Sequence, residues 1–305
     1  MTGRIVVFGD VFDDIVVVPS GPIRSDTDTA SVIRTSAGGS AANTAAWLGR
    51  LGAPVDFVGR VAAADLRRHA DALASCGVTP HLIADSELPT GTIVVLVDGD
   101  RRSMLTDKGA NALLTADAVT DGLVDAASLI HFTGYSLFGS GRDAAAARLM
   151  VRAAERGVGV SVDPGSAGFI ADLGVERFLA AVAGASLLFP NLEEGRLLSG
   201  RKEPDEVAAA LARRFAVVAL TLGAAGAVVA AADGVERVSA EPVTVVDPTG
   251  AGDAFAAGFL ASWLRSADPF AAARAGARAG AMAVSRTGAR PRCSTAGRPA
   301  GGPRS

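Results

Sequence analysis

The stretch Val243–Leu260 reads VTVVDPTGAGDAFAAGFL. We expect a strand over Val243–Val246, then a glycine-rich turn, then a long apolar helix that begins near Ala251. The amides of Gly250, Ala251 and Gly252 would lie unpaired at the N-terminus of that helix, where the helix dipole favours an anion. Because glycine has no Cβ atom to keep a phosphate away, this turn predicts a phosphate-binding site.

Asp253 falls in the first turn of the same expected helix. There it could take the proton from a hydroxyl that attacks a bound phosphoryl group, and general-base assistance of this kind contributes about 10²–10⁴-fold. An acidic residue that only complements the helix dipole would leave the same pattern. Motifs elsewhere in the chain are therefore needed to decide whether Asp253 is a catalytic base or only complements the helix dipole.

The composition excludes several classes of protein. The 305 residues suffice for one large α/β domain or two modest ones. The net charge of −3 gives no electrostatic footprint for nucleic acid. No apolar run reaches the roughly 18–20 residues of a membrane span, and the N-terminal MTGRIVVFGD is too short for a secretory signal. We expect a cytoplasmic protein with neither nucleic acid nor membrane as partner.

The cysteines are Cys76 and Cys293, far apart and without CxxC spacing. This predicts two free reduced thiols rather than a disulfide framework or a zinc site.

The alternation of strands and helices predicts an α/β fold with a doubly wound, mostly parallel sheet. The expected strands of this sheet are Ile5–Phe8, Val55–Val58, Leu129–Phe132, Val158–Val162, Leu187–Phe189 and Val217–Thr221, with hairpin-like strands at Val228–Ala231 and Val235–Ser239. The expected helices are Ser40–Leu51, Asp65–Ser75, Asp143–Arg156, Leu192–Leu198, Pro204–Phe215, Ala251–Arg265 and Pro269–Arg286.

Two further segments, about 11–36 and 88–108, contain strand patterns without helices between them. The second has a hairpin turn signal at Asp98-Gly99-Asp100. Together they predict a small separate β-sheet that serves as a lid on a domain of residues 1–290. The segment 291–305 is rich in Gly, Pro, Arg and Ser, and we expect it to be a disordered tail.

Four motifs in one order resemble the ribokinase-like (PfkB) carbohydrate kinase family. DPTGAGDAFAAGF resembles its C-terminal signature, and AGGSAANTAAWLGRLG at 37–52 resembles its N-terminal signature. The sequence PNLEE at 190–194 is similar to its NxxE motif, and TLGAAG at 221–226 to its nucleotide turn. The resemblance extends from about Arg4 to Pro291. One such motif is weak evidence, but four in register favour a catalytic role for Asp253.

This resemblance implies ATP-dependent phosphorylation of a hydroxyl on a sugar or sugar-like substrate. Asp253 is implied as the base, with Gly250, Ala251 and Gly252 as the anion hole. Nucleotide-binding residues are implied to be Asn191, Thr221, Gly223 and Gly226. Glu194 would act on Mg²⁺, through bound water because Mg²⁺ tends to retain its waters.

The implied acceptor site consists of Asp14, Gly39 and Asn43, joined by Phe12 and Ser40, where the chain departs from the family. Ribokinases proper usually read GGKGAN where this chain has GGSAAN, so Ser40 replaces a lysine. Phe12 and Gly134 also stand where ribose sites often carry polar or acidic residues. A pocket that cannot pair every hydroxyl discriminates against a polyol. We therefore expect a less polar or bulkier sugar, or a nucleoside whose base stacks on Phe12.

Two further properties follow from the resemblance alone. Asp247 and Thr249, with carbonyls near Ala283, Arg286 and Gly288, match positions that bind K⁺ in some members. The lid sheet pairs two subunits in some relatives, which makes a homodimer possible here.

Two alternatives stay open within the family. One is a nucleoside kinase of the adenosine or pseudouridine type. The other is a non-catalytic member that binds nucleotide or sugar. The presence of Asp253 counts against this alternative, because degenerate members can lose the base without losing the fold. A Rossmann dehydrogenase is disfavoured because Gly9 leads into DVFDD rather than GxGxxG, and no P-loop GxxxxGK[ST] is present.

Overall fold

The computed structural model describes residues 3–98 and 101–293. Nine strands of these residues form the main sheet. Their spatial order is β13 (Gly234–Val238), β12 (Ala227–Ala231), β11 (Val217–Thr221), β10 (Leu187–Leu188), β9 (Gly159–Asp163), β8 (Leu129–Thr133), β1 (Ile5–Phe8), β4 (Val55–Ala62) and β5 (Val78–Asp85). All neighbours from β11 to β5 pair in parallel, while β12 and β13 form an antiparallel edge. The expected mostly parallel sheet is confirmed.

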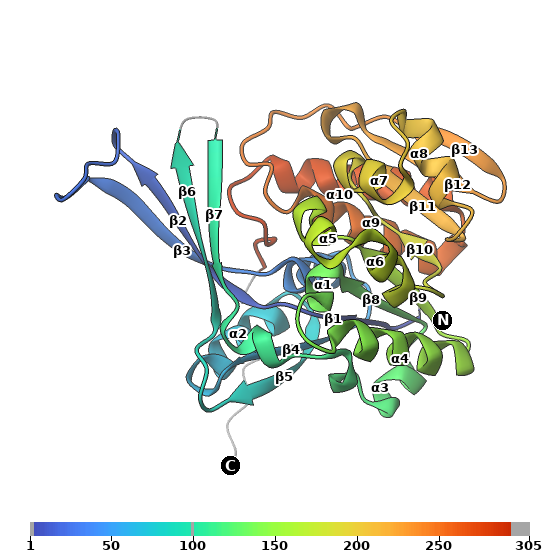
Figure 1. Cartoon of the computed structure of the whole chain (residues 1–305), viewed down its shortest axis with the longest axis horizontal. Coiled ribbons are helices and arrows are strands. Elements are labelled where there is room, and N and C mark those ends of the chain that lie inside the picture. The colour runs from blue at the N-terminus through green and yellow to red at the C-terminus, as the bar shows by residue number, and fades with distance from the viewer. Residues whose placement is uncertain (1–2, 99–100, 294–305) are drawn as a thin grey trace, which may run out of the picture.

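Helices cover both faces of this sheet, and each face has its own buried apolar cluster (Figure 1). One face carries α1 (Ser40–Arg50), α2 (Leu66–Ser75), α9 (Ala251–Ser266) and α10 (Pro269–Val284). The other carries α3 (Asp121–Ala126), α4 (Arg142–Glu155), α5 (Ala167–Leu173), α6 (Val175–Ala181), α7 (Leu192–Ser199) and α8 (Pro204–Leu211). Short 3₁₀ turns lie at Ala63–Asp65, Gly109–Leu113, Ala116–Ala118, Gly134–Leu137 and Gly223–Ala225. Because both faces are covered, β1 and β8 are buried along their whole length.

Small side chains let the helices on the first face pack closely. A Cβ atom at Gly258 of α9 would lie 2.7 Å from the Ala275 carbonyl oxygen and 3.0 Å from the Gly276 Cα of α10. The buried alanines of α1, including Ala42 and Ala46, belong to the same cluster as α9. This close packing brings the N-terminus of α9 against that of α1.

A second sheet extends away from the main one, as expected (Figure 1). Its order is β3 (Ser31–Gly38), β2 (Phe12–Pro19), β6 (Gly91–Asp98) and β7 (Arg101–Asp107). β2 and β6 pair in parallel, and the other neighbours are antiparallel. Of the predicted hairpin turn, Gly99 and Asp100 lie outside the described residues. We call this sheet the lid.

The predicted strand at Val243–Val246 is wrong. The segment is irregular, with a bend at Val246, and it pairs with no strand of the described residues. Instead the amide of Val246 donates to the Val284 carbonyl oxygen at the end of α10, at 2.7 Å. The pattern also missed β5, α3, α5 and α6, which are short or have mixed burial.

The prediction of two free thiols is also wrong, because Cys76 and Cys293 form a disulfide. The chain after α10 returns to α1, where Trp47 Nε1 donates to the Ala289 carbonyl oxygen at 3.0 Å. That return brings together two cysteines separated by 217 residues, a proximity that spacing alone does not reveal. Pro291 and Cys293 are therefore placed, and the rest of the expected tail, 294–305, lies outside the described residues.

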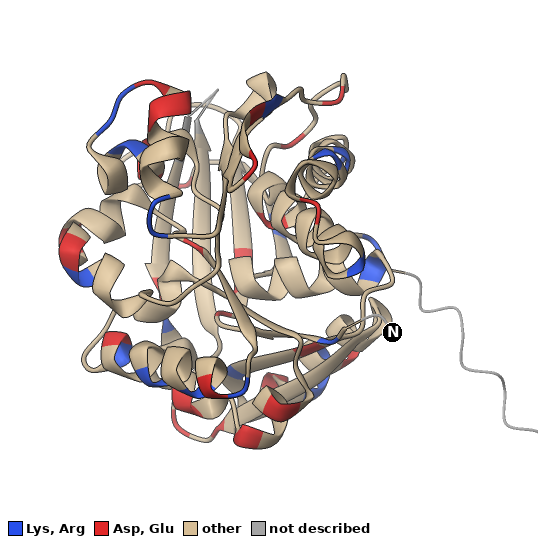
Figure 2. Cartoon of the chain, turned by 90° about the vertical axis from the view of Figure 1, so that its right-hand side faces the viewer, with Lys and Arg blue, Asp and Glu red and all other residues tan. Residues whose placement is uncertain are grey.

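Charged side chains are mixed in sign over the surface helices in Figure 2. Ion pairs join α4 to the region of α3: Arg148 and Arg152 of α4 pair with Asp117 and Asp121, and Arg156, directly after α4, pairs with Asp125. No helix of the described residues has both the length and the apolar character to cross a membrane.

Candidate active site

Polar residues gather at the edge where the parallel strands end. Asp10 follows β1, Thr133 and Asp163 end β8 and β9, Asn191 follows β10, and Thr221 ends β11. Ligands of open α/β sheets bind at this edge. Together with the lid and the N-terminus of α9, it encloses a cleft of about 520 Å³.

Asp253 lies in this cleft in the first turn of α9, as predicted. Its Oδ1 accepts a hydrogen bond from Ser40 Oγ at 2.7 Å, and its Oδ2 accepts one from Asn43 Nδ2 at 3.0 Å. Burial raises the pKa of Asp253 to about 7, although these two hydrogen bonds act in the opposite direction. A carboxylate that titrates near neutral pH is suited to accept a proton from a hydroxyl.

The turn before Asp253 requires glycine at one position and leaves open space at another. Gly250 has φ 78°, and a Cβ atom there would lie 2.7 Å from the Ala289 Cα. A Cβ atom at Gly252 would meet nothing within 4 Å. The amide of Ala251 donates to the Pro248 carbonyl oxygen at 3.3 Å, a long bond. The backbone of this turn is therefore open to the cleft at Gly252.

The residues predicted for the acceptor, Phe12, Asp14, Gly39, Ser40 and Asn43, all line the cleft. Burial raises the pKa of Asp14 to about 6. Its Oδ1 is buried and accepts no hydrogen bond from any described residue. Buried polar atoms normally have partners, so this oxygen is suited to accept a hydrogen bond from a substrate hydroxyl.

Asp10 was missed by the sequence reasoning. It accepts hydrogen bonds from the amides of Ser40 (2.9 Å) and Ala41 (3.2 Å) and from Thr133 Oγ1 (3.3 Å). These bonds join the N-terminus of α1 to the sheet and so fix Ser40 and Asn43 beside Asp253. The position of Asp10 directly after the first buried strand could have revealed it.

Glu194 and Asp163 are two further carboxylates that line the cleft. Glu194 Oε2 accepts a hydrogen bond from the backbone amide of Asn191 at 2.9 Å, and Asn191 Oδ1 accepts one from the backbone amide of Glu194 at 2.9 Å. The two bonds form a capping box at the start of α7. Burial raises the pKa of Glu194 to about 7. Burial, followed by the charges of Glu194 and Asp253, also raises the pKa of Asp163.

Asp163 was not predicted, although an aspartate at the end of a parallel strand, in VDPG, is a usable signal. Two carboxylates whose ionised forms are disfavoured by burial would gain from a nearby cation, and oxygen ligands suit Mg²⁺. Among the described residues, no group of three or more His, Cys, Asp or Glu side chains is arranged to hold a metal. A metal here would need further oxygen ligands from phosphate and water.

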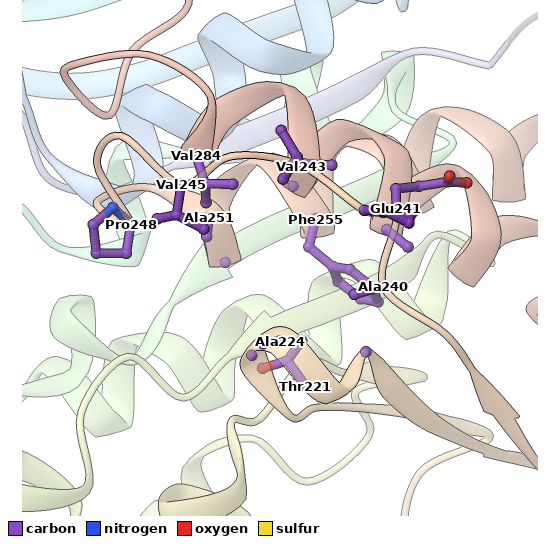
Figure 3. Close-up of a pocket in the computed structure, with 17 residues that line it drawn as sticks. Thr221, Ala224, Ala240, Glu241, Val243, Val245, Pro248, Ala251, Phe255 and Val284 are labelled. Atoms are coloured by element: carbon purple, nitrogen blue, oxygen red, sulfur yellow. The ribbon is translucent and has the colours of Figure 1, made fainter.

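A second cavity of about 500 Å³ adjoins the cleft (Figure 3). The predicted nucleotide residues Thr221, Gly223 and Gly226 line it, whereas Asn191 lines the first cleft. Gly226 has φ 88°, and a Cβ atom there would lie 2.0 Å from the Val238 carbonyl oxygen. Residues shared by both cavities are Thr221, Pro248, Ala251, Gly252 and Phe255.

The wall of this second cavity is mainly apolar. Figure 3 shows Val243, Val245 and Pro248 along one side, with Phe255 directed toward the turn that carries Ala224. The segment that was wrongly predicted as a strand thus forms a wall of the cavity. A flat apolar group such as a nucleobase would fit between this wall and the turn, with polar groups directed toward Gly252.

Asp247 and Thr249 hold the glycine turn against the end of α10. Asp247 Oδ1 accepts from the amide (3.0 Å) and hydroxyl (2.7 Å) of Thr249, and its Oδ2 accepts from the Gly288 amide at 3.0 Å. The carbonyl-bearing residues Ala283, Arg286 and Gly288 lie at this end of α10. The structure therefore places the predicted cation ligands in one region.

The absence of an acidic residue at Gly134 has a steric reason. A Cβ atom there would lie 2.0 Å from the Pro164 carbonyl oxygen. The neighbouring Tyr135 lines the cleft and donates to the Gly165 carbonyl oxygen at 2.6 Å.

Comparison with known proteins identifies the family. The pfkB family carbohydrate kinase model matches residues 2–296. An ATP-dependent ribose-1-phosphate kinase of Halopiger xanaduensis is 34% identical over 263 residues, which are 84% of this chain and 83% of that protein.

Solved structures show the same fold. An adenosine kinase from Sinorhizobium meliloti superposes with a TM-score of 0.84 at 24% identity, covering 95% of this chain and 96% of that one. The Arabidopsis thaliana ribokinase complexed with ribose and ATP has a TM-score of 0.79 at 27% identity, with 95% of both chains covered. With its ribokinase-like fold and a family match over nearly its whole length, the chain belongs to the pfkB family of carbohydrate kinases.

Proposed function

We propose that this kinase transfers the γ-phosphoryl group of ATP to a hydroxyl of a sugar or sugar-like acceptor, with Asp253 as the base. The observation that carries the proposal is the place of Asp253. It lies where the acceptor cleft meets the second cavity, next to an open glycine turn, and its pKa is raised to about 7. A neighbouring hydroxyl and phosphoryl group would both be within its reach.

In this proposal the acceptor lies under the lid, where Asp14 Oδ1 accepts a hydrogen bond from one of its hydroxyls. The reacting hydroxyl faces Asp253, which takes its proton as the new bond to phosphorus forms. The adenine lies in the second cavity, and the phosphates follow the turn at Gly250–Gly252. Most of the acceleration would come from alignment and from stabilisation of charge at the helix N-terminus.

Magnesium fits two of the carboxylates that line the cleft. Glu194 and Asp163 would hold it, at least partly through water, and the ion would supply positive charge to the phosphates. K⁺ would bind near Asp247 and Thr249 and stabilise the turn that contacts the phosphates.

The lid makes one wall of the cleft apolar. Phe12, Ile93, Val95 and Met104 of the lid, with Phe169 of α5, line it. Such a wall would pack against a nucleobase or another apolar substituent better than against a free polyol. A nucleoside is therefore the second candidate acceptor.

Lys108, at the base of the lid, could bind a different kind of substituent on the acceptor. It lines the cleft, and its Nζ donates to the Phe138 carbonyl oxygen at 2.9 Å. Its remaining protons could bind an anionic substituent, which brings a sugar phosphate such as ribose 1-phosphate into the set to be tested.

A lid-mediated homodimer and a cytoplasmic location also remain predictions. The lid exposes apolar side chains, among them Val32, Ile33, Met104 and Leu105. A second subunit could cover these side chains.

Gly252→Ala should weaken ATP binding without loss of stability. The new Cβ atom would meet no protein atom within 4 Å, but it would project into the space proposed for the phosphates. We expect an unchanged or slightly higher Tm, since alanine favours helices, together with at least about tenfold weaker ATP binding. Calorimetry measures both, and Gly122→Ala is the control because its Cβ atom on α3 also meets nothing within 4 Å. ATP affinity equal to wild type would remove the turn from the phosphate site.

Asp253→Asn should retain the fold and ATP binding but lose turnover by about 10²–10⁴-fold or more. The introduced amide can accept from Asn43 and donate to Ser40 Oγ, so both hydrogen-bonding positions stay filled. An ADP-release assay with parallel ATP titration measures the two properties. Asp268→Asn is the matched control, because Asp268 caps α10 through its side chain and asparagine is an equally good cap. Near wild-type turnover of the Asp253 variant would exclude the base role.

A panel of acceptors should show a preference for a substituted sugar over ribose. We expect at least about tenfold higher kcat/KM for adenosine or pseudouridine than for ribose, because the apolar lid wall leaves the hydroxyls of a free polyol unpaired. Ribose 1-phosphate should also exceed ribose if Lys108 binds its phosphate. Coupled ADP release, with and without K⁺, gives the comparison. Efficient phosphorylation of ribose alone would contradict this expectation but not the kinase activity.

A further inference from the structure

Arg290 reaches the acceptor site from the chain that follows α10. Its Nη2 donates to the Gly38 carbonyl oxygen at 2.7 Å, and its Nε donates to Asn43 Oδ1 at 3.4 Å. Its Nη1 is buried and has no hydrogen-bond partner among the described residues. Arg290 therefore contacts both the end of the lid strand β3 and the helix α1 that carries Ser40 and Asn43.

The segment that carries Arg290 is anchored on both sides. Before it, the Ala289 carbonyl oxygen accepts from Trp47 Nε1, and Ala289 packs against Gly250 of the phosphate turn. After it, Cys293 is joined to Cys76 by the disulfide. The guanidinium is thus held in one place by contacts that do not involve substrate.

The bond to Asn43 sets the orientation of an amide that contacts the base. Arginine can only donate hydrogen bonds, so the oxygen of Asn43 has to face it. The amide nitrogen of Asn43 then faces Asp253, and it donates to Oδ2 at 3.0 Å. If the Asn43 amide were flipped, its NH₂ group would face the Arg290 Nε–H group, which is also a donor. Its oxygen would then face the oxygens of the Asp253 carboxylate, which are also acceptors.

Arg290 also supplies a positive charge beneath several carboxylates. Burial lowers its pKa only to about 10, so it is charged at neutral pH, and Asp14, Asp10, Asp13 and Asp253 favour that charge. It lowers the pKa of Asp14 against the larger effect of burial. Asp13 is already paired with Arg68, whose Nη1 and Nη2 each lie 2.7 Å from a carboxylate oxygen. The charge of Arg290 therefore acts chiefly on Asp14. Its link to Asp253 runs through Asn43, whose hydrogen bond lowers the pKa of Asp253.

Other titratable groups face the same region. They are Asp10 after β1, Asp13 on β2, Arg68 and His69 on α2, Tyr135 after β8, Asp163 on β9 and Glu194 on α7. The carboxylates among them disfavour ionisation of Asp14 and Asp253. Arg290 acts against that effect.

We infer that Arg290 is a positioning residue for phosphoryl transfer: it orients the amide of Asn43 toward the base Asp253 and places a positive charge close to Asp14. The inference rests on the proposed function for its link to turnover, but its effect on the two carboxylates does not depend on turnover. Removal of the guanidinium stabilises the protonated form of Asp14 directly. It also releases the Asn43 amide, whose hydrogen bond lowers the pKa of Asp253, so both pKa values should rise.

Titration of the Asp14 and Asp253 carboxyl carbons by ¹³C NMR tests this directly, with Asp14→Asn and Asp253→Asn for assignment. In Arg290→Met and Arg290→Gln both pKa values should rise by about 1 unit or more. Arg290→Lys keeps the charge and should stay close to wild type. Arg292→Met is the matched control, since Arg292 is exposed on the same segment and should leave both values unchanged.

Kinetics supply the second readout. In the two neutral variants, the acidic limb of the kcat/KM profile should move to higher pH with the carboxyl pKa, and kcat should fall by about 10- to 100-fold. Arg290→Lys should restore the limb but not the full kcat, because an ammonium group cannot reproduce the fixed geometry of the guanidinium.

Unchanged carboxyl pKa values in a folded neutral variant would overturn the inference. If neither neutral variant folds in a thermal melt, Arg290→Lys decides, and wild-type kcat in that variant would overturn the positioning role. Wild-type chain that transfers no phosphate, with the NMR shifts as expected, would contradict the proposed function and leave the effect of Arg290 on the carboxylates supported.

Discussion

The contact between the N-termini of α1 and α9 is the constraint on which the site depends. It sets Asp253 against Ser40 and Asn43, residues that are 213 and 210 positions away in the chain. Burial of a carboxylate there is unfavourable in itself, as its pKa of about 7 shows. The fold maintains the contact through alanine and glycine packing between α1, α9 and α10, and through Asp10, which ties α1 to the sheet. Burial of Asp253 therefore lowers the stability of the folded protein at the position where the proposed reaction needs a base.

The two cavities and the lid are arranged around this contact. The parallel strands end at one edge, so their terminal residues converge on the acceptor cleft, while the edge hairpin and α10 form the second cavity. Ala251 and Gly252 of the glycine turn line both cavities, which is the arrangement that an in-line transfer between two bound substrates requires. The lid closes the remaining side with apolar residues and one carboxylate, Asp14, and so gives the acceptor site its character.

Local patterns were sufficient to predict the parallel sheet, the lid as a separate sheet and the place of Asp253. Each of these depends on a short run of residues, such as the buried strand at Ile5–Phe8 or the GAGD turn. Val243–Val246 failed because a β-branched run has strand propensity whether or not a partner strand exists. Asp10 and Asp163 were accessible in principle, since each directly follows or ends a parallel strand.

Arg290 and the Cys76–Cys293 disulfide could not be predicted in this way. Their roles arise only after the chain beyond α10 returns to α1, and no local pattern encodes that return. The identity of the acceptor could not be predicted from local patterns either, because the cleft is formed by residues from the lid, α5, α9 and several strand ends. Its selectivity is a property of their combined surface.

The pH dependence of kcat/KM for phosphoryl transfer tests the central claim most directly. The acidic form of Asp253 cannot accept a proton, and its pKa is about 7. The rate should therefore fall about tenfold per pH unit below neutrality and level off above it, and this limb should be missing from the residual activity of Asp253→Asn. A profile that is flat through pH 7 in the wild type, or an identical limb in the variant, would contradict Asp253 as the base.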